Sequence, residues 1–164
     1  MKDNRFVTCE NFVPLVAPQD IAAAATATPF VSLKNALHGA LYISFGSITA
    51  ASADQSITVT LEAATAAASG SEVAIPFKYR LSGAVGSNTW GAITDATSSG
   101  MSVATTDDNK MLAIEIPGGL DSLLADATHV RAVITPNAGG TATLTNAFAV
   151  LEPRYAQLTH VSAT

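Results

Sequence analysis

The feature that most constrains the fold is a series of short, nearly uncharged segments in which apolar and polar residues alternate. The clearest covers residues 57–65, where Ile57, Val59 and Leu61 alternate with two threonines and a glutamate. Successive side chains of a β-strand point to opposite faces, so this alternation predicts a strand with one buried face. Related patterns recur at residues 41–48, 73–81, 111–116, 129–135 and 141–151.

Strands at this spacing, with no long helical pattern between them, favour an antiparallel β-sandwich over a fold in which strands and helices alternate. Weaker strands are predicted at residues 30–33, 89–94 and 101–104. Periodicity alone leaves both a jelly-roll and an immunoglobulin-like topology open. Pro76 lacks an N–H and is expected at an edge or a bulge.

Two local features accompany these strands. Residues 129–135 and 141–151 are expected to form a hairpin across the turn at 136–140, which contains two glycines. Leu120, Leu123 and Leu124 have helical spacing, so residues 117–126 are expected to place one helical turn at an end of the sandwich.

The 164 residues suffice for one domain, which we place at residues 29–155. Residues 1–28 lack a sustained period and are expected to be an extended N-terminal arm, with a short helix after Asp20 as the alternative. Residues 156–164 are expected to be a C-terminal tail. The apolar side chains of the arm are costly to leave in water, so they are our candidate interface residues: Phe6, Val7, Phe12 and Val13.

Charge and composition narrow the function. Charged residues make up 13% of the chain and the net charge is −5, with eight scattered Lys and Arg, so we expect no nucleic-acid partner. So little charge fits either a surface covered by partners or an ordinary Ser/Thr-coated domain. No segment is apolar enough to span a bilayer and no signal-peptide pattern is visible, so we expect synthesis in the cytoplasm and no membrane. Cys9 stands alone and is expected to be a small apolar filler.

No catalytic, metal-binding or cofactor-binding pattern stands out. The three histidines, His38, His129 and His160, are far apart and lack metal-ligand spacing. The run Asp107-Asp108-Asn109 lacks the ligand spacing of a calcium loop and is expected to be a turn. Glu62 and Glu115 are expected to face solvent. We therefore do not expect an enzyme.

The aromatic residues Tyr42, Tyr79 and Trp90 leave two interpretations open. Aromatic faces bind sugars well, so these three could form a platform like that of a carbohydrate-binding module. They also lie beside other apolar residues on predicted strands, and this favours core packing.

The order of these features resembles the jelly-roll head decoration, or cement, proteins of tailed bacteriophages. The resemblance lies in FVSLKNALHGALYISFGSI at 30–48, SITVTLEAA at 56–64, the strand at 75–81, HVRAVIT at 129–135 and AFAVLEPRY at 147–155. Glu62-Ala63-Ala64 replaces the usual Glu-Gln-Ala of such proteins. The resemblance covers most of residues 30–155 and leaves the arm and the tail unmatched.

The resemblance implies a jelly-roll sandwich on the capsid surface of the virion, bound to the major capsid protein, and without catalytic residues. It also implies a homo-oligomer, either a trimer or a dimer. Two alternatives remain at this point: another virion structural component, in the tail or the head–tail connector, and a carbohydrate-binding β-sandwich module.

Overall fold

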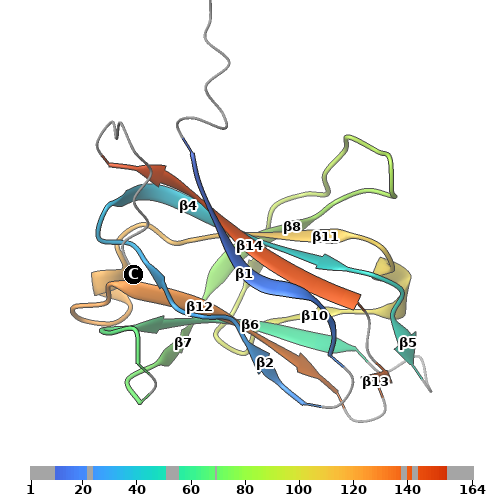
Figure 1. The fold of residues 1–164 in the computed structure, drawn as a ribbon, viewed down its shortest axis with the longest axis horizontal. Helices are drawn as coiled ribbons and strands as arrows, with labels where there is room; N and C mark the ends of the chain where they lie inside the picture. Colours follow the sequence, from blue (N-terminus) through green and yellow to red (C-terminus); the bar gives the residue numbers. More distant parts are fainter. Residues whose placement is uncertain are drawn as a thin grey trace, which may run out of the picture.

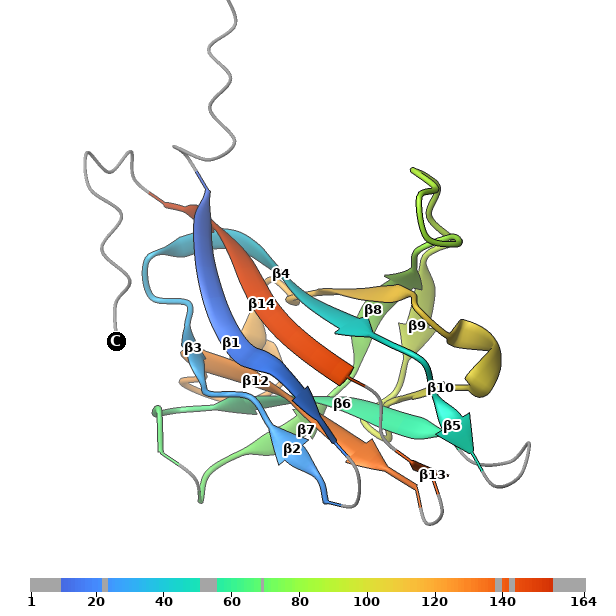
Figure 2. The ribbon, with the colours of Figure 1, turned by 45° about the vertical axis from the view of Figure 1, so that its right-hand side comes forward.

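The computed structural model describes residues 10–21, 24–50, 56–68, 70–137, 140–141 and 144–154. They form two antiparallel β-sheets that pack face to face (Figures 1 and 2). The first sheet has the order β1 (Asn11–Asp20), β14 (Leu144–Pro153), β4 (Ala36–Phe45), β11 (Met111–Glu115), β8 (Phe77–Leu81) and β9 (Thr94–Ala96). The second has the order β10 (Met101–Val103), β6 (Ile57–Ala64), β12 (His129–Pro136) and β2 (Thr26–Ala27), with β3 (Val31–Ser32) beside β12 and β7 (Val73–Ile75) beside β6.

Small elements complete the described structure. Strands β5 (Thr49–Ala50) and β13 (Gly140–Thr141) pair with each other, and there are two 3-10 turns, η1 (Thr105–Asp107) and η2 (Leu120–Ser122). Leu120 is buried and Leu124 packs against the core, which confirms the predicted helical turn.

The path of the chain is that of a jelly roll. β1 lies in the first sheet, β2 and β3 in the second, β4 in the first, β6 and β7 in the second, β11 in the first, β12 in the second and β14 in the first. Between β7 and β11 the chain adds β8 and β9 to the first sheet and β10 to the second. This repeated crossing places β14 between β1 and β4, and β12 between β2 and β6. The double Greek key of a jelly roll has this arrangement. The prediction of an all-β, jelly-roll-like sandwich is therefore confirmed.

Alternate side chains of the central strands fill the space between the sheets. The largest wholly buried ones are Leu41, Ile43, Val59, Leu61, Ile75, Val103, Leu112, Ile114, Val130, Ile134 and Thr145. Each buried Val, Leu or Ile contributes about 1.5–3 kcal/mol relative to an exposed position. Alanines occupy other inward positions, among them Ala63, Ala132 and Ala149, so the core is built mainly of aliphatic side chains.

Pro76 divides what the sequence predicts as one strand. β7 before it pairs with β6 in the second sheet, whereas β8 after it pairs with β11 and β9 in the first. A proline has no N–H for a ladder, so the chain can leave one sheet here without losing a hydrogen bond. The expected irregularity at Pro76 is thus a change of sheet.

The predicted hairpin of residues 129–135 and 141–151 is wrong. β12 pairs with β6, β2 and β3 in the second sheet, and β14 pairs with β1 and β4 in the first. The connecting turn therefore crosses between the sheets. Alternation specifies which face of a strand is buried, and both arrangements bury the same faces.

The predicted N-terminal arm also differs from the structure where it is described. β1 pairs with β14 along its length, β2 pairs with β12, and Ile21 and Thr28 are buried. The segment is extended as expected, but it closes one edge of the sandwich. Its described part shows strand at Thr26–Ala27 where the alternative placed a helix. Residues 1–9 and the predicted tail at 156–164 lie outside the described residues.

The short strand expected at residues 89–94 is also different. Trp90 forms an isolated bridge with Ser82, and the strand β9 begins only at Thr94. The intervening chain forms a loop that rises above the outer face of the first sheet (Figure 2).

Candidate functional site

The four candidate interface residues differ in where the structure places them. Phe6 and Val7 lie outside the described residues. The side chain of Phe12 is 42% exposed on the outer face of the first sheet, next to Val150 of β14. Val13, its neighbour in the alternation, points inward, is partly buried and packs against the core.

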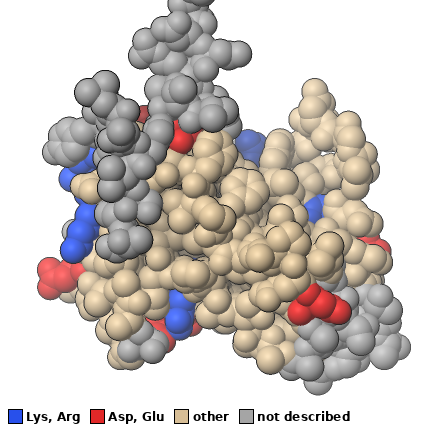
Figure 3. Space-filling view, in the orientation of Figure 1, with Lys and Arg blue, Asp and Glu red and all other residues tan. Residues whose placement is uncertain are grey.

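The edge formed by β1 carries almost no charge. From Asn11 to Gln19 the strand contains no Lys, Arg, Asp or Glu, and Asp20 ends it. Figure 3 shows this side of the molecule, and the charged side chains visible there lie toward its margins. The register shifts around Val16 and the two prolines of β1 interrupt the regular edge, which limits unselective pairing with other strands.

An apolar patch extends from β1 across the outer face of the first sheet. Pro14 lies opposite Phe148, and Phe148 lies opposite Tyr42. The Phe148 and Tyr42 rings stack with centroids 5.2 Å apart and an interplanar angle of 14°. We call Phe12, Pro14, Phe148 and Val150, which lie on β1 and β14, the β1 patch.

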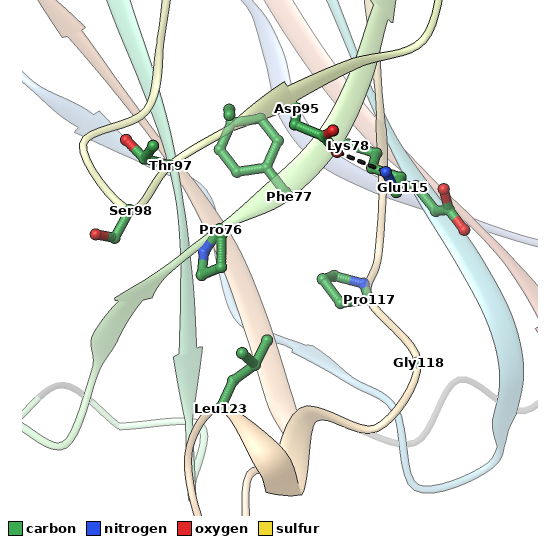
Figure 4. Close-up of a pocket in the computed structure, with 11 residues that line it drawn as sticks. Pro76, Phe77, Lys78, Asp95, Thr97, Ser98, Glu115, Pro117, Gly118 and Leu123 are labelled. Atoms are coloured by element: carbon green, nitrogen blue, oxygen red, sulfur yellow. Dashed lines mark hydrogen bonds and ion pairs between the residues drawn. The ribbon is translucent and has the colours of Figure 1, made fainter.

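A large cavity lies toward the opposite edge of the first sheet. Its volume is about 780 Å³, and Pro76, Phe77, Pro117 and Leu123 surround it (Figure 4). The Lys78 ammonium and the Asp95 carboxylate form an ion pair at its rim, 2.5 Å apart, with Glu115 nearby. The hydrogen bond to Asp95 and its negative charge raise the pKa of Lys78, so this ammonium keeps its proton at physiological pH.

A second hollow, of about 220 Å³, lies on the outer face beside this cavity. Ala113 of β11 stands between Tyr42 of β4 and Arg80 of β8, and its small side chain leaves the space open. Lys78, Ile93 and Glu115 complete the rim. Lys78 and Glu115 line both the hollow and the large cavity, so the two spaces adjoin each other.

Of the three aromatic residues that the sequence groups together, the structure brings Tyr42 and Trp90 into contact and turns Tyr79 toward the core. Tyr79 points inward and packs against Phe77 and the core. Trp90 is 39% exposed, and its ring lies edge-on to Tyr42 with centroids 6.5 Å apart. The outward position of Tyr42 is readable from the sequence, because the alternation that buries Leu41 and Ile43 turns Tyr42 to the other face. The position of Trp90 depends on a loop and carries no such signal.

The described residues show no group of three or more His, Cys, Asp or Glu side chains placed to hold a metal ion. Asp107 and Asp108 form the predicted turn: Asp108 accepts a hydrogen bond from the Ile48 N–H at 2.6 Å, and Asp107 pairs with Lys110 at 2.8 Å. Glu62 and Glu115 face outward on different sheets. In the described part of the chain, no helix is long and apolar enough to cross a membrane.

Neither a protein-family model nor a curated protein matches this sequence. Two similar solved structures are those of the infectious bursal disease virus Gx and Gt strains, with TM-scores of 0.25 and 0.26. They share 11% and 10% sequence identity with this chain and cover 88% and 93% of it. The chain spans only 40% and 42% of their length, and a likeness at these scores is too weak to assign a fold or a function.

Proposed function

We propose that this protein is a structural component of a virion that decorates the capsid of a tailed bacteriophage by binding the shell of the major capsid protein. The observation that carries the proposal is the uncharged β1 edge with its apolar patch, in a jelly-roll chain whose sequence resembles head decoration proteins. An apolar patch rimmed by polar residues is typical of a protein interaction site.

The geometry indicates which edge of the sandwich would face the shell. β1 and the β1 patch lie at one edge of the first sheet, and the charged rim of Lys78, Asp95 and Glu115 lies toward the other edge. An attachment through β1 would bury Phe12 and Pro14 while the charged rim stays in water. Few charges would then have to be stripped of water on binding, which is the costly part of a protein interface.

The decisive experiment is mass spectrometry and cryo-electron microscopy of the parent particle. A decoration protein is expected in hundreds of copies with its density on the head, as the resemblance implies. A handful of copies at the neck or tail would instead identify the alternative virion role, and absence from purified particles would refute both.

A binding assay tests the surface itself. Purified protein is mixed with shells that lack it, and the bound fraction is measured after sedimentation. The double variant Phe12→Ser, Val150→Ser is expected to lose binding, because each serine removes apolar area worth about 1–2 kcal/mol. Val73→Ser, an exposed valine on the second sheet, is the matched control and is expected to bind normally. Equal binding by all three proteins would contradict attachment through β1.

A truncation test has to respect the fold. Removing residues 1–18 would strip most of β1 from β14, so a loss of binding could reflect a damaged sheet. Deleting residues 1–9 alone leaves β1 intact and tests whether Phe6 and Val7 contribute to attachment.

A further inference from the structure

We propose that the hollow bordered by Tyr42 and Arg80, together with the Trp90 ring beside these two residues and the adjoining cavity, is a binding site for a neutral oligosaccharide. This inference does not depend on the shell-binding proposal, because it concerns the other half of the outer face. The site lies over β4 to β9, which are two to five strand spacings from β1, or about 10–24 Å. A protein attached through β1 would therefore hold this site away from the shell.

The aromatic groups provide the first argument. Trp90 remains 39% exposed although burying an indole is strongly favourable. Its backbone is held by the bridge to Ser82, and the N–H of Gly91 donates to the carbonyl of Leu81 at 2.8 Å. Tyr42 is fixed by its stack on Phe148. The Tyr42 and Trp90 rings are thus fixed in place and partly exposed. Their surface suits the C–H face of a pyranose ring.

The polar groups provide the second argument. The Arg80 guanidinium lies over the Trp90 ring, 5.7 Å from its centroid, and among the described residues it forms no ion pair. Its fork of N–H donors can reach a pair of neighbouring hydroxyls. Across the hollow, the Glu115 carboxylate offers acceptors. A few fixed donors and acceptors around an apolar floor are the usual composition of a small-molecule site.

The charges and the volumes decide the class of ligand. Lys78 and Arg80 balance Asp95 and Glu115, so the site favours neither a polyanion nor a polycation. The hollow of 220 Å³ suits a single sugar ring, and the cavity of 780 Å³ beside it lies in the usual range for ligands, about 300–1,000 Å³. Because Lys78 and Glu115 border both spaces, one chain of several sugar units can occupy them together.

Trp90 is the chain's single tryptophan and therefore reports directly on this site. The experiment titrates the protein with hexasaccharides of α- and β-linked glucose, mannose, galactose and N-acetylglucosamine while the tryptophan fluorescence is recorded. We expect a saturable change in intensity or wavelength with at least one of them. No saturable change with any member of the panel, or tighter binding of the polyanion heparin, would overturn the proposal.

Two variants and a control locate the binding. Ala113→Leu fills the hollow from an outward position, and Arg80→Gln removes the guanidinium; each is expected to weaken binding about tenfold or more. Val85→Ser changes an exposed valine in the loop between β8 and β9, which also carries Trp90. This variant is expected to bind the sugar like the natural protein. Thermal melting confirms that all variants are folded. Undiminished binding by Ala113→Leu and Arg80→Gln would place the sugar elsewhere and refute the assignment.

Discussion

At the residue scale, Arg131 shows how a chain with few charges uses them. On the outer face of the second sheet its guanidinium pairs with Glu62 at 2.7 Å and Glu72 at 2.8 Å, and it lies 4.5 Å from the Phe30 ring centroid. The pKa of Glu72 is lowered, chiefly by the backbone N–H of Gly70, and Arg131 adds to the effect. One cation thereby connects β12, β6, the segment before β7 and the segment before β3.

Replacing Arg131 by methionine is expected to destabilise the protein by about 1–3 kcal/mol, because Glu62 and Glu72 would face each other without a cation. The free energy of unfolding in urea measures this loss. Arg80→Gln is the matched control, since Arg80 is exposed and has no carboxylate partner among the described residues, and it is expected to stay within about 0.5 kcal/mol. Equal losses for the two variants would show that the Arg131 network adds nothing.

His129 predicts a pH dependence of stability. The pKa of its imidazole is lowered, first by burial and then by the charge of Lys34, and its Nδ1 lies 2.8 Å from the Thr128 hydroxyl. As the pH falls below about 6.5, the unfolded chain takes up this proton before the folded protein does. Stability is therefore expected to decline from pH 7.5 to pH 5.5. In the variant His129→Gln, the decline in stability between these two pH values is expected to be smaller, and melting curves at both pH values measure it. An unchanged decline would contradict the assignment of this pH dependence to His129.

At the scale of elements, the sequence predicts strands better than it predicts their partners. β6, β11 and β12 are recognisable because each alternates between a buried and an exposed face. The partners of β12 and β14, the change of sheet at Pro76 and the docking of β1 were missed. Each of these depends on packing between segments distant in the chain, which alternation does not encode. The proximity of Tyr42 and Trp90 likewise depends on how the loop with Trp90 lies against the outer face of the first sheet, and the sequence does not indicate this.

The turn between β9 and β10 is one of the points where the chain changes sheets. Gly100 ends it with a φ of +87°, and a methyl group there would overlap the Val59 carbonyl oxygen. Gly100→Ala is expected to cost about 2 kcal/mol or more, through backbone strain and this overlap. Gly118→Ala, where a methyl group meets open space, is the control and is expected to be nearly neutral. Chemical denaturation compares the two, and similar midpoints would contradict this account of the turn.

At the scale of the whole molecule, the two edges of the sandwich differ in character. The β1 edge is mostly apolar and carries one charged residue, Asp20, whereas the β8 and β9 edge carries the ion pair, the hollow and the cavity. We propose that the first edge holds the protein on a shell and the second meets a sugar. A decorated particle would then present a layer of weak sugar sites, whose combined strength exceeds that of any single one.

The pairing of β1 with β14 has a consequence for biosynthesis. Among the strands that the structure describes, β1 leaves the ribosome first and its partner is made last. At about 5–20 residues per second, β1 waits on the order of ten seconds for the strand that completes its hydrogen bonds. β1 can therefore complete its hydrogen bonds only after β14 has been made, and until then its two prolines disfavour pairing with a neighbouring nascent chain.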